Sequence, residues 1–204
     1  LLSVTASITA RVRRILGEQA GLAPEAVLVH AIHSHSGPTT DYDMIGWGQP
    51  DAPYIETLPQ RIARAGLDAL ARLQPATLHH AEAPCEGIGY NREYEFGRPG
   101  RPTLAEALRE DWRPAKPELT DTSCHVLRID AEGGGGVLGF VSYFGCHPVV
   151  CCEDTHYIHG DYAGVATNLL ERENPGAVGL FLQGALGDVN TCFVHHSEQD
   201  SMLA

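Results

Sequence analysis

The chain has 204 residues, of which 43% are hydrophobic and 20% are charged, as in an ordinary globular protein. Its 14 Lys and Arg stand against 26 Asp and Glu, for a net charge of −12, and this balance excludes a typical nucleic-acid-binding protein, which needs clustered cations for phosphate contacts. No apolar run approaches the roughly 20 residues that a transmembrane helix needs.

The first part of the chain predicts a helix, a strand and a second helix. Apolar residues recur at helical spacing over residues 3–20, and Gly21 follows as a C-cap. The apolar run at 25–32 predicts a buried strand. A helix is predicted over 53–73, in which Pro59 either kinks the helix or marks its true start. Because the chain starts inside a helical pattern and stops without a terminating signal, we expect a fragment that is incomplete at both ends.

The second part predicts mainly strands. We expect strands at 76–83, 123–129 and 137–144, and the Gly-rich stretch DAEGGGG joins the last two as a hairpin. Residues 85–117 form a long connection without hydrophobic period, and such connections are typically functional or mobile. A helix at 161–173 and a strand at 178–182 complete the pattern. The alternation predicts a single α/β domain, with a mixed sheet flanked by helices.

The six cysteines are irregularly spaced and contain no CxxC pair. The adjacent Cys151 and Cys152 are unsuited to an ordinary disulfide bond, because their Cα atoms are too close together. We therefore expect free and mostly buried thiols.

Polar side chains follow three of the predicted strands. His33 and His35 come after the first, and on an extended chain two residues spaced in this way face the same side. His147 follows the strand 137–144, and a Gly-rich segment leading to Asp188 follows the strand 178–182. Ligands of α/β sheets bind beyond the carboxyl ends of the strands. We therefore hypothesise that these ends converge on a zinc site; the alternative is that the histidines simply meet solvent.

A second polar segment, CCEDTHYIHGD, covers residues 151–161. It is either an exposed loop or a second metal site that would use Glu153, Asp154, His156 and His159. Asp161 is expected to cap the helix that follows it, and the alternative is that it orients a ligand histidine.

Asp188 likewise has two interpretations. It satisfies backbone donors of a tight turn after Gly187, or it orients a metal-bound water or a histidine.

Four motifs of the chain resemble those of the neutral, non-lysosomal ceramidases. They are HSHSGP at 33–38, YNRE at 90–93, FGCHP at 144–148 and QGALGDVN at 183–190. They occur in the family's order, and the region from the first motif to the last spans most of the chain. The resemblance implies a partial catalytic domain over residues 1–204, and a zinc-dependent hydrolase that cleaves a linear amide (N-acyl) bond.

The resemblance also implies roles for individual residues. His33 and His147 match zinc ligands, and His35 matches a histidine that contacts the reacting group. Arg92 matches an arginine that forms a hydrogen bond near the scissile amide. The family's other zinc ligands, a Glu and a Tyr, are expected downstream of residue 204.

One departure from the family concerns the nucleophile. In the ceramidases the Gly-Asp-Val motif continues with a serine, whereas this chain has Asn190. A serine nucleophile is therefore absent from this position, and we expect metal-activated water to attack while Asn190 stabilises the oxyanion. Thr191 or Cys192 could instead replace the serine. A second alternative is a non-catalytic ligand- or glycan-binding domain derived from the same family.

The expected partner is a small-molecule or lipid-like amide substrate and the expected cofactor is Zn²⁺; no nucleic acid is expected. The resemblance suggests a secreted, periplasmic or membrane-surface protein, while the cysteine pattern also allows the cytoplasm. Membrane contact and oligomeric state are left open.

Overall fold

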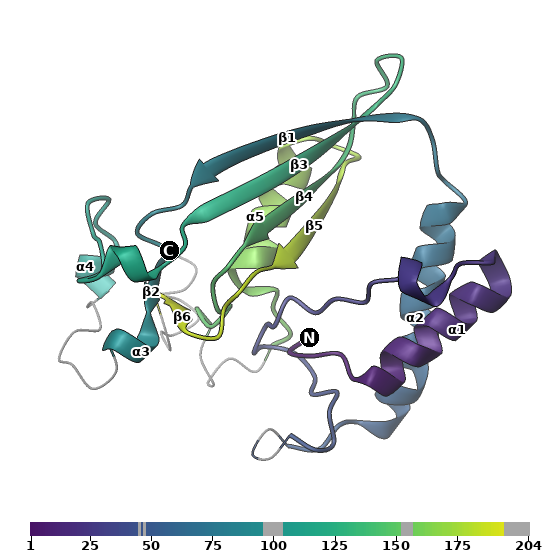
Figure 1. Cartoon of the computed structure of the whole chain (residues 1–204), viewed down its shortest axis with the longest axis horizontal. Helices are drawn as coiled ribbons and strands as arrows, with labels where there is room; N and C mark the ends of the chain where they lie inside the picture. The colour runs from purple at the N-terminus through teal and green to yellow at the C-terminus, as the bar shows by residue number, and fades with distance from the viewer. Residues whose placement is uncertain (45, 47, 96–103, 152–156, 194–204) are drawn as a thin grey trace. The chain divides into compact units, whose positions relative to one another are not determined.

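The computed structural model describes all residues except 45, 47, 96–103, 152–156 and 194–204 (Figure 1). The chain divides into two units. Unit 1 comprises residues 1–31 and 38–75, and unit 2 comprises residues 32–37 and 76–204. Among the described residues, no helix is long and apolar enough to cross a membrane.

Unit 1 contains a pair of packed helices, α1 (Ala6–Ala20) and α2 (Ala52–Leu70). Helix α1 begins after Thr5, whose side chain accepts a hydrogen bond from the backbone N–H of Ile8. It ends at Gly21, which has the left-handed φ of 67° that the predicted C-cap requires. The buried side chains of the two helices form one cluster with Val27: Ile8, Val12, Leu16, Leu58 and Ala63.

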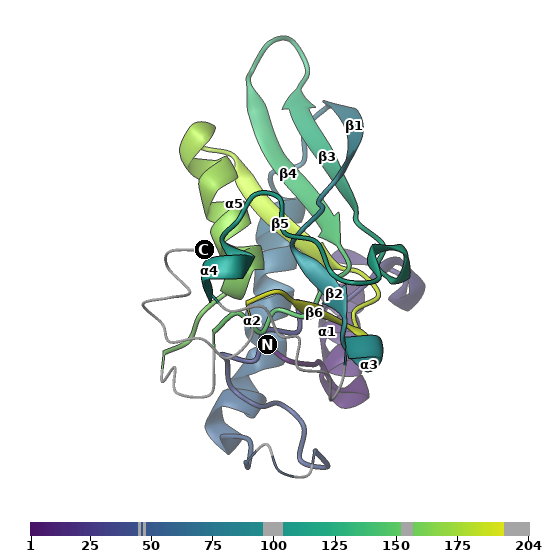
Figure 2. The same ribbon diagram turned by 90° about the vertical axis from the view of Figure 1, so that its left-hand side faces the viewer.

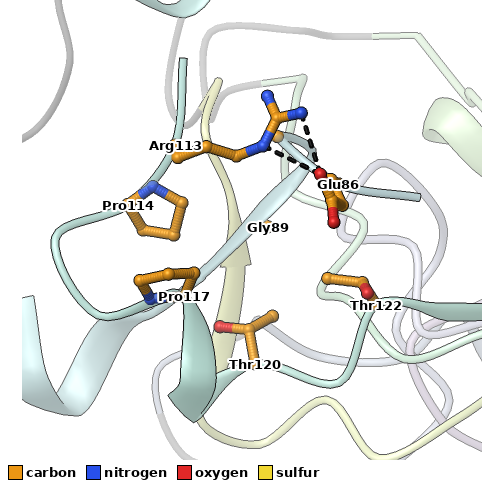
Figure 3. A pocket seen from close by; sticks show the side chains of 8 residues that line it. Glu86, Gly89, Arg113, Pro114, Pro117, Thr120 and Thr122 are labelled. Atoms are coloured by element: carbon orange, nitrogen blue, oxygen red, sulfur yellow. Dashed lines mark hydrogen bonds and ion pairs between the residues drawn. The ribbon is translucent and has the colours of Figure 1, made fainter. Parts of the chain in front are cut away.

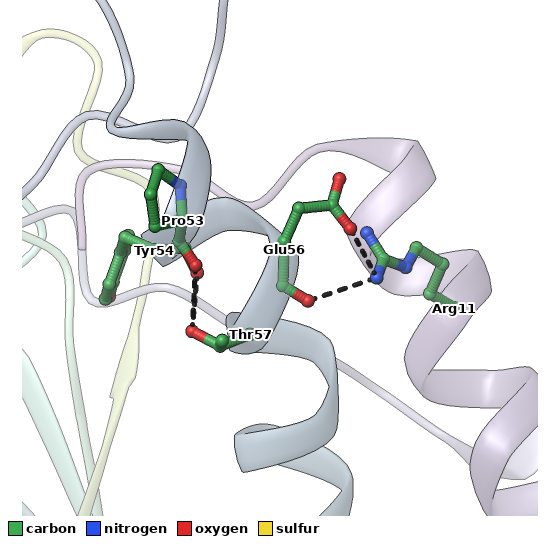
Figure 4. Close-up of polar contacts among 5 residues, drawn as sticks. All are labelled: Arg11, Pro53, Tyr54, Glu56 and Thr57. Atoms are coloured by element: carbon green, nitrogen blue, oxygen red, sulfur yellow. Dashed lines mark hydrogen bonds and ion pairs between the residues drawn. The ribbon is translucent and has the colours of Figure 1, made fainter.

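Helix α2 begins before Pro59, which was one of the two starts that the sequence allowed. Asp51 caps it by accepting a hydrogen bond from the N–H of Tyr54 (2.8 Å). The helix continues through Pro59 to Leu70, so the prediction that Pro59 marks its start is wrong. Arg11 of α1 forms an ion pair with Glu56 of α2 at 3.1 Å (Figure 4). The two side chains of this ion pair are partly exposed to solvent, which weakens their attraction, so the apolar cluster contributes most of the packing energy.

The predicted strand at 25–32 is wrong. Residues Pro24–Ala26 form a 3₁₀ turn, η1, and no described residue pairs with the extended segment that follows. The side chain of Val27 packs into the cluster of α1 and α2. Its carbonyl accepts a hydrogen bond from Arg13 Nε at 3.0 Å, so a side chain supplies the donor that a neighbouring strand would supply in a sheet. Val29 also packs against this cluster, whereas Leu28 is 78% exposed, so the expected burial holds for only part of the run and is against helices.

Replacing Ile8 with Ala should destabilise unit 1 by about 2–5 kcal/mol, because a buried branched side chain leaves a cavity that relaxes only partly. Ile8 is only 1% exposed. The change is measured as the free energy of unfolding by chemical denaturation. Leu73→Ala is the control: this side chain is 77% exposed, and its loss should cost less than about 0.5 kcal/mol. Equal effects of the two variants would contradict the described packing.

Unit 2 is built on a four-stranded sheet in the order β1-β3-β4-β5. Its strands are β1 (Ala76–Pro84), β3 (Ser123–Ala131), β4 (Val137–Phe144) and β5 (Val178–Gln183). Strand β3 pairs antiparallel with both β1 and β4, whereas β4 and β5 pair in parallel. The predicted mixed sheet and hairpin are therefore confirmed. The hairpin tip uses Gly133, Gly134 and Gly136 at positive φ, which explains the glycine run.

Helix α5 (Asp161–Glu173) has the bounds that the sequence predicts and lies beside β5 (Figures 1 and 2). Tyr162 packs edge-on against Phe144 and Phe181 of the sheet. A side chain at Gly179 would meet the Cβ of Thr167 at 2.8 Å, so this glycine permits the close approach of helix and strand.

A small second sheet joins the long connection to the end of the chain. Strand β2 (Gly89–Asn91) pairs antiparallel with β6 (Val189–Thr191), side by side in Figure 2. The connection also holds the short helices α3 (Arg92–Glu95) and α4 (Leu104–Ala107) and a 3₁₀ turn, η2 (Pro117–Leu119). The stretch predicted as one loop is therefore partly ordered by pairing with a segment about 100 residues away.

Candidate metal centre

Three histidines from two distant segments of unit 2 meet at one point. One ring nitrogen from each of His33, His35 and His147 lies within 4.8 Å of the other two. The ring centroids are 4.9 Å apart for His33 and His147, and 5.1 Å apart for His33 and His35. Zn–N bonds are about 2.0–2.1 Å long, so nitrogens at this separation can share one ion. The expected approach of His33 and His147 is found.

His147 is held in one orientation by the backbone. Its backbone N–H donates to the carbonyl of Val189 at 2.9 Å, and its ring Nδ1 lies 2.6 Å from the carbonyl oxygen of Leu186. A carbonyl only accepts hydrogen bonds, so Nδ1 carries the proton and Nε2 keeps a free electron pair. This is the tautomer in which Nε2 can bind a metal.

The surroundings of His147 favour the neutral imidazole. Burial lowers the pKa of His147 most, and the nearby charges of Arg92 and His33 lower this pKa further, against an opposing contribution from the Leu186 carbonyl. A metal binds the neutral form of histidine, so these effects prepare the side chain as a ligand.

His33 and His35 lie on a loop and not on a strand. The backbone of His33 has a φ of 65°, which is uncommon for a residue other than glycine. The alternation expected on a strand therefore does not explain why the two rings meet, and that prediction is wrong. The loop residue between them, Ser34, is 2% exposed, and its hydroxyl donates to the carbonyl of His159 at 2.8 Å.

Arg92 lies where β2 ends and α3 begins. Its backbone N–H donates to the carbonyl of Asp188 at 2.7 Å. Its guanidinium is close enough to His147 to lower the pKa of that histidine. The buried Nε of Arg92 has no hydrogen-bond partner among the described residues, which is rare for a buried donor and leaves it available to a bound molecule.

Asn190 lies next to the same histidine. It pairs with Tyr90 in the small sheet and forms an isolated bridge with His147. Its side chain is 8% exposed, and Oδ1 is buried without a partner among the described residues. The unpaired Oδ1 can accept a hydrogen bond from a bound molecule, whereas donation to an oxyanion would have to come from Nδ2.

The two alternative nucleophiles are poorly placed for the role. Thr191 is buried, and its hydroxyl already donates to the carbonyl of Phe193 at 2.6 Å. Burial raises the pKa of the Cys192 thiol to about 11, so the reactive thiolate is scarce at neutral pH. All five described cysteines carry free thiols; Cys152 lies outside the described residues.

The carboxylates of Asp188 and Asp161 have partners other than the three histidines. The exposed carboxylate of Asp188 accepts a hydrogen bond from Asn91 Nδ2 at 2.9 Å, and a carbonyl, not this carboxylate, contacts the ring of His147. Asp161 is the first residue of α5, and Gly160 is the N-cap, so the prediction that Asp161 is the cap is wrong. Its carboxylate accepts hydrogen bonds from the N–H groups of Cys151 and Tyr162, while burial raises its pKa.

The second polar segment is only partly described. Glu153, Asp154 and His156 lie outside the described residues. His159 contacts the loop of His33 and His35 through its backbone. Neither this contact nor that of Leu186 could be predicted, because backbone groups leave no signal in the residue types.

The cavities among the described residues of unit 2 include two that matter here, and none of the three histidines lines either of them. One, of about 300 Å³, has Arg113 on its wall, paired through two nitrogens with one carboxylate oxygen of Glu86 at 3.1 and 2.9 Å (Figure 3). The other, of about 420 Å³, is mostly apolar and is lined by residues that include Ile88, His159, Tyr162, Leu169 and Phe193.

Comparison with known proteins supports the resemblance of the motifs. The family model described as neutral/alkaline non-lysosomal ceramidase, N-terminal, matches residues 2–199. The crystal structure of neutral ceramidase from Pseudomonas aeruginosa has a TM-score of 0.74 and 23% identity, over 94% of this chain and 30% of that chain. A ceramidase complexed with C2 has a TM-score of 0.70 and 23% identity, over 90% of this chain and 28% of that chain. The chain thus spans less than a third of each, and at this identity the likeness concerns the fold. Since the family model matches nearly the whole sequence, the chain belongs to the neutral/alkaline non-lysosomal ceramidase family.

Proposed function

We propose that this chain carries part of the active site of a zinc-dependent hydrolase that cleaves a linear N-acyl amide bond. The observation that carries the proposal is the cluster of His33, His35 and His147, whose ring nitrogens lie within 4.8 Å of one another. The proposal is also supported by membership of the ceramidase family.

The residues of the cluster fit a zinc ion. Imidazole nitrogen is a preferred zinc ligand, and the ligands of a catalytic zinc come from separate segments and leave one position open. We assign His33 and His147 as ligands. His147 is suited to this role because its Nδ1 is held by the Leu186 carbonyl and its neutral form is favoured.

A zinc ion held there would lower the pKa of bound water towards about 7 and polarise a carbonyl group. His35 is beside the ligands and would hold or donate a proton at the reacting group. The guanidinium of Arg92 and the amide of Asn190, both adjacent to His147, would stabilise the negative charge on the amide oxygen. No residue of the chain is then required as a covalent nucleophile.

We propose that the substrate is a lipid-like amide. We also propose that this protein acts outside the cytoplasm or at a membrane surface. The apolar cavity of about 420 Å³ beside α5 supports an apolar group in the substrate, since it is lined by Ile88, Leu169 and Phe193. The net charge of −12 supports an uncharged or zwitterionic substrate over a polyanion.

Removing zinc tests the proposal. Treatment with a chelator should abolish hydrolysis of a fluorogenic N-acyl amide, and zinc alone should restore it, because Asn190 occupies the position of the serine nucleophile and the attacking water would need the metal. Magnesium, which prefers oxygen ligands, is the control and should not restore activity. Hydrolysis that is unaffected by the chelator would contradict the proposal. Zinc binding without hydrolysis would favour the alternative of a non-catalytic binding domain.

A further inference from the structure

The loop that carries His33 and His35 has an unfavourable backbone and needs external support. It has no regular secondary structure, and His33 adopts a left-handed φ of 65°. A non-glycine residue keeps such a conformation only where its surroundings hold it there. The two imidazoles can meet His147 only while the loop keeps this shape.

The support comes from His159, more than 120 residues away along the chain. The backbone N–H of His159 donates to the carbonyl of Ser36 at 2.9 Å. Its carbonyl accepts a hydrogen bond from the hydroxyl of Ser34 at 2.8 Å. The same hydroxyl accepts a hydrogen bond from the N–H of Ser36 at 3.3 Å, so Ser34 joins both sides of the contact. The two serines are 2% and 8% exposed, so water does not compete strongly for these bonds.

His159 is in turn fixed to the start of α5. Its ring Nδ1 accepts a hydrogen bond from the N–H of Asp161 at 2.8 Å and lies 3.4 Å from Cys151 Sγ. The carboxylate of Asp161, which is 1% exposed, accepts a further hydrogen bond from the N–H of Cys151 at 3.1 Å. A continuous set of hydrogen bonds therefore connects the first turn of a long helix to the histidine loop.

We infer that His159 and Ser34 are positioning residues, which hold the loop so that His33 and His35 face His147. This inference rests on the proposed function, since it assigns the loop geometry to zinc binding. The side chain of His159 acts indirectly: it fixes the backbone of residue 159, and that backbone holds the loop. His159 and Asp161 of the second polar segment thereby acquire a role in support of the candidate metal centre.

Two variants test the inference by zinc affinity, measured by competition with a chromophoric chelator. Ser34→Ala and His159→Ala should each weaken zinc binding about 10–100-fold, as loss of residues that orient metal ligands typically does. His159→Asn should restore most of the affinity, because its amide oxygen can take the place of Nδ1 as an acceptor. The control is Thr40→Val, which removes another hydroxyl that is 2% exposed and donates to a carbonyl, that of Ser3, at 2.7 Å.

Amide hydrogen exchange of residues 33–37 in the zinc-free protein is the second readout. Exchange should become faster in Ser34→Ala and His159→Ala and stay unchanged in Thr40→Val. Wild-type affinity and exchange in both variants would overturn the inference and leave the proposed function intact. If the wild-type protein bound no zinc, the proposed function would fail, and unchanged exchange would then also exclude the support of the loop by His159.

Discussion

Replacing His147 with Ala should weaken zinc binding by more than about 100-fold and abolish amide hydrolysis with it. Even residues that merely orient a ligand contribute about 10–100-fold to metal affinity, so loss of a ligand should cost more. His147 is 5% exposed and is fixed by two backbone carbonyls, which makes replacement by a water molecule a poor substitute. Affinity is measured by chelator competition, and hydrolysis by release of a fluorescent amine.

His33→Ala should give the same result from the other segment of the cluster, which guards against a local folding defect at His147. His79→Ala is the matched control, because this histidine lies on β1 and its side chain is 55% exposed. Circular dichroism should show intact secondary structure in all three variants. Wild-type zinc affinity in both His33→Ala and His147→Ala would exclude the proposed ligands.

Replacing Asn190 with Ala should slow hydrolysis by about 10²–10³-fold, the usual cost of losing one donor to an oxyanion. Zinc affinity should stay unchanged, because we do not assign Asn190 as a ligand. The loss should appear mainly in kcat, since the charge on the amide oxygen develops in the transition state. The measurement is steady-state kinetics on an N-acyl amide, and Asn168→Ala, exposed on α5, is the control.

The same position tests the absence of an acyl-enzyme. The wild-type protein should release product without a burst from an activated substrate, because Asn190 cannot form an ester with the acyl group. Asn190→Ser restores the residue that the ceramidase motif carries, and a burst in this variant would be evidence that the serine reacts. A burst in the wild-type protein, or full activity in Asn190→Ala, would contradict the mechanism proposed for this loop.

The sequence by itself determined most regular elements and the identity of the chemical groups. Helices α1 and α5 and strands β3 to β5 follow from local hydrophobic period, caps and turns, which act over a few residues. The motifs around His33, His147 and Asn190 identified the family, because these residue types recur there in a set order.

The tertiary structure alone decided how these groups come together. The run at 25–32 is as apolar as a buried strand, but it forms no strand: Val27 and Val29 pack against helices and Leu28 is exposed, because a local pattern does not determine the packing partner. The meeting of His33 and His35 depends on a left-handed backbone held from residue 159, and the tautomer of His147 depends on the carbonyl of Leu186. Each of these contacts has a main-chain group, which every residue possesses, on at least one side, and the sequence separation reaches 125 residues. Their energies depend on the folded path of the chain, so no residue type in the sequence could indicate them.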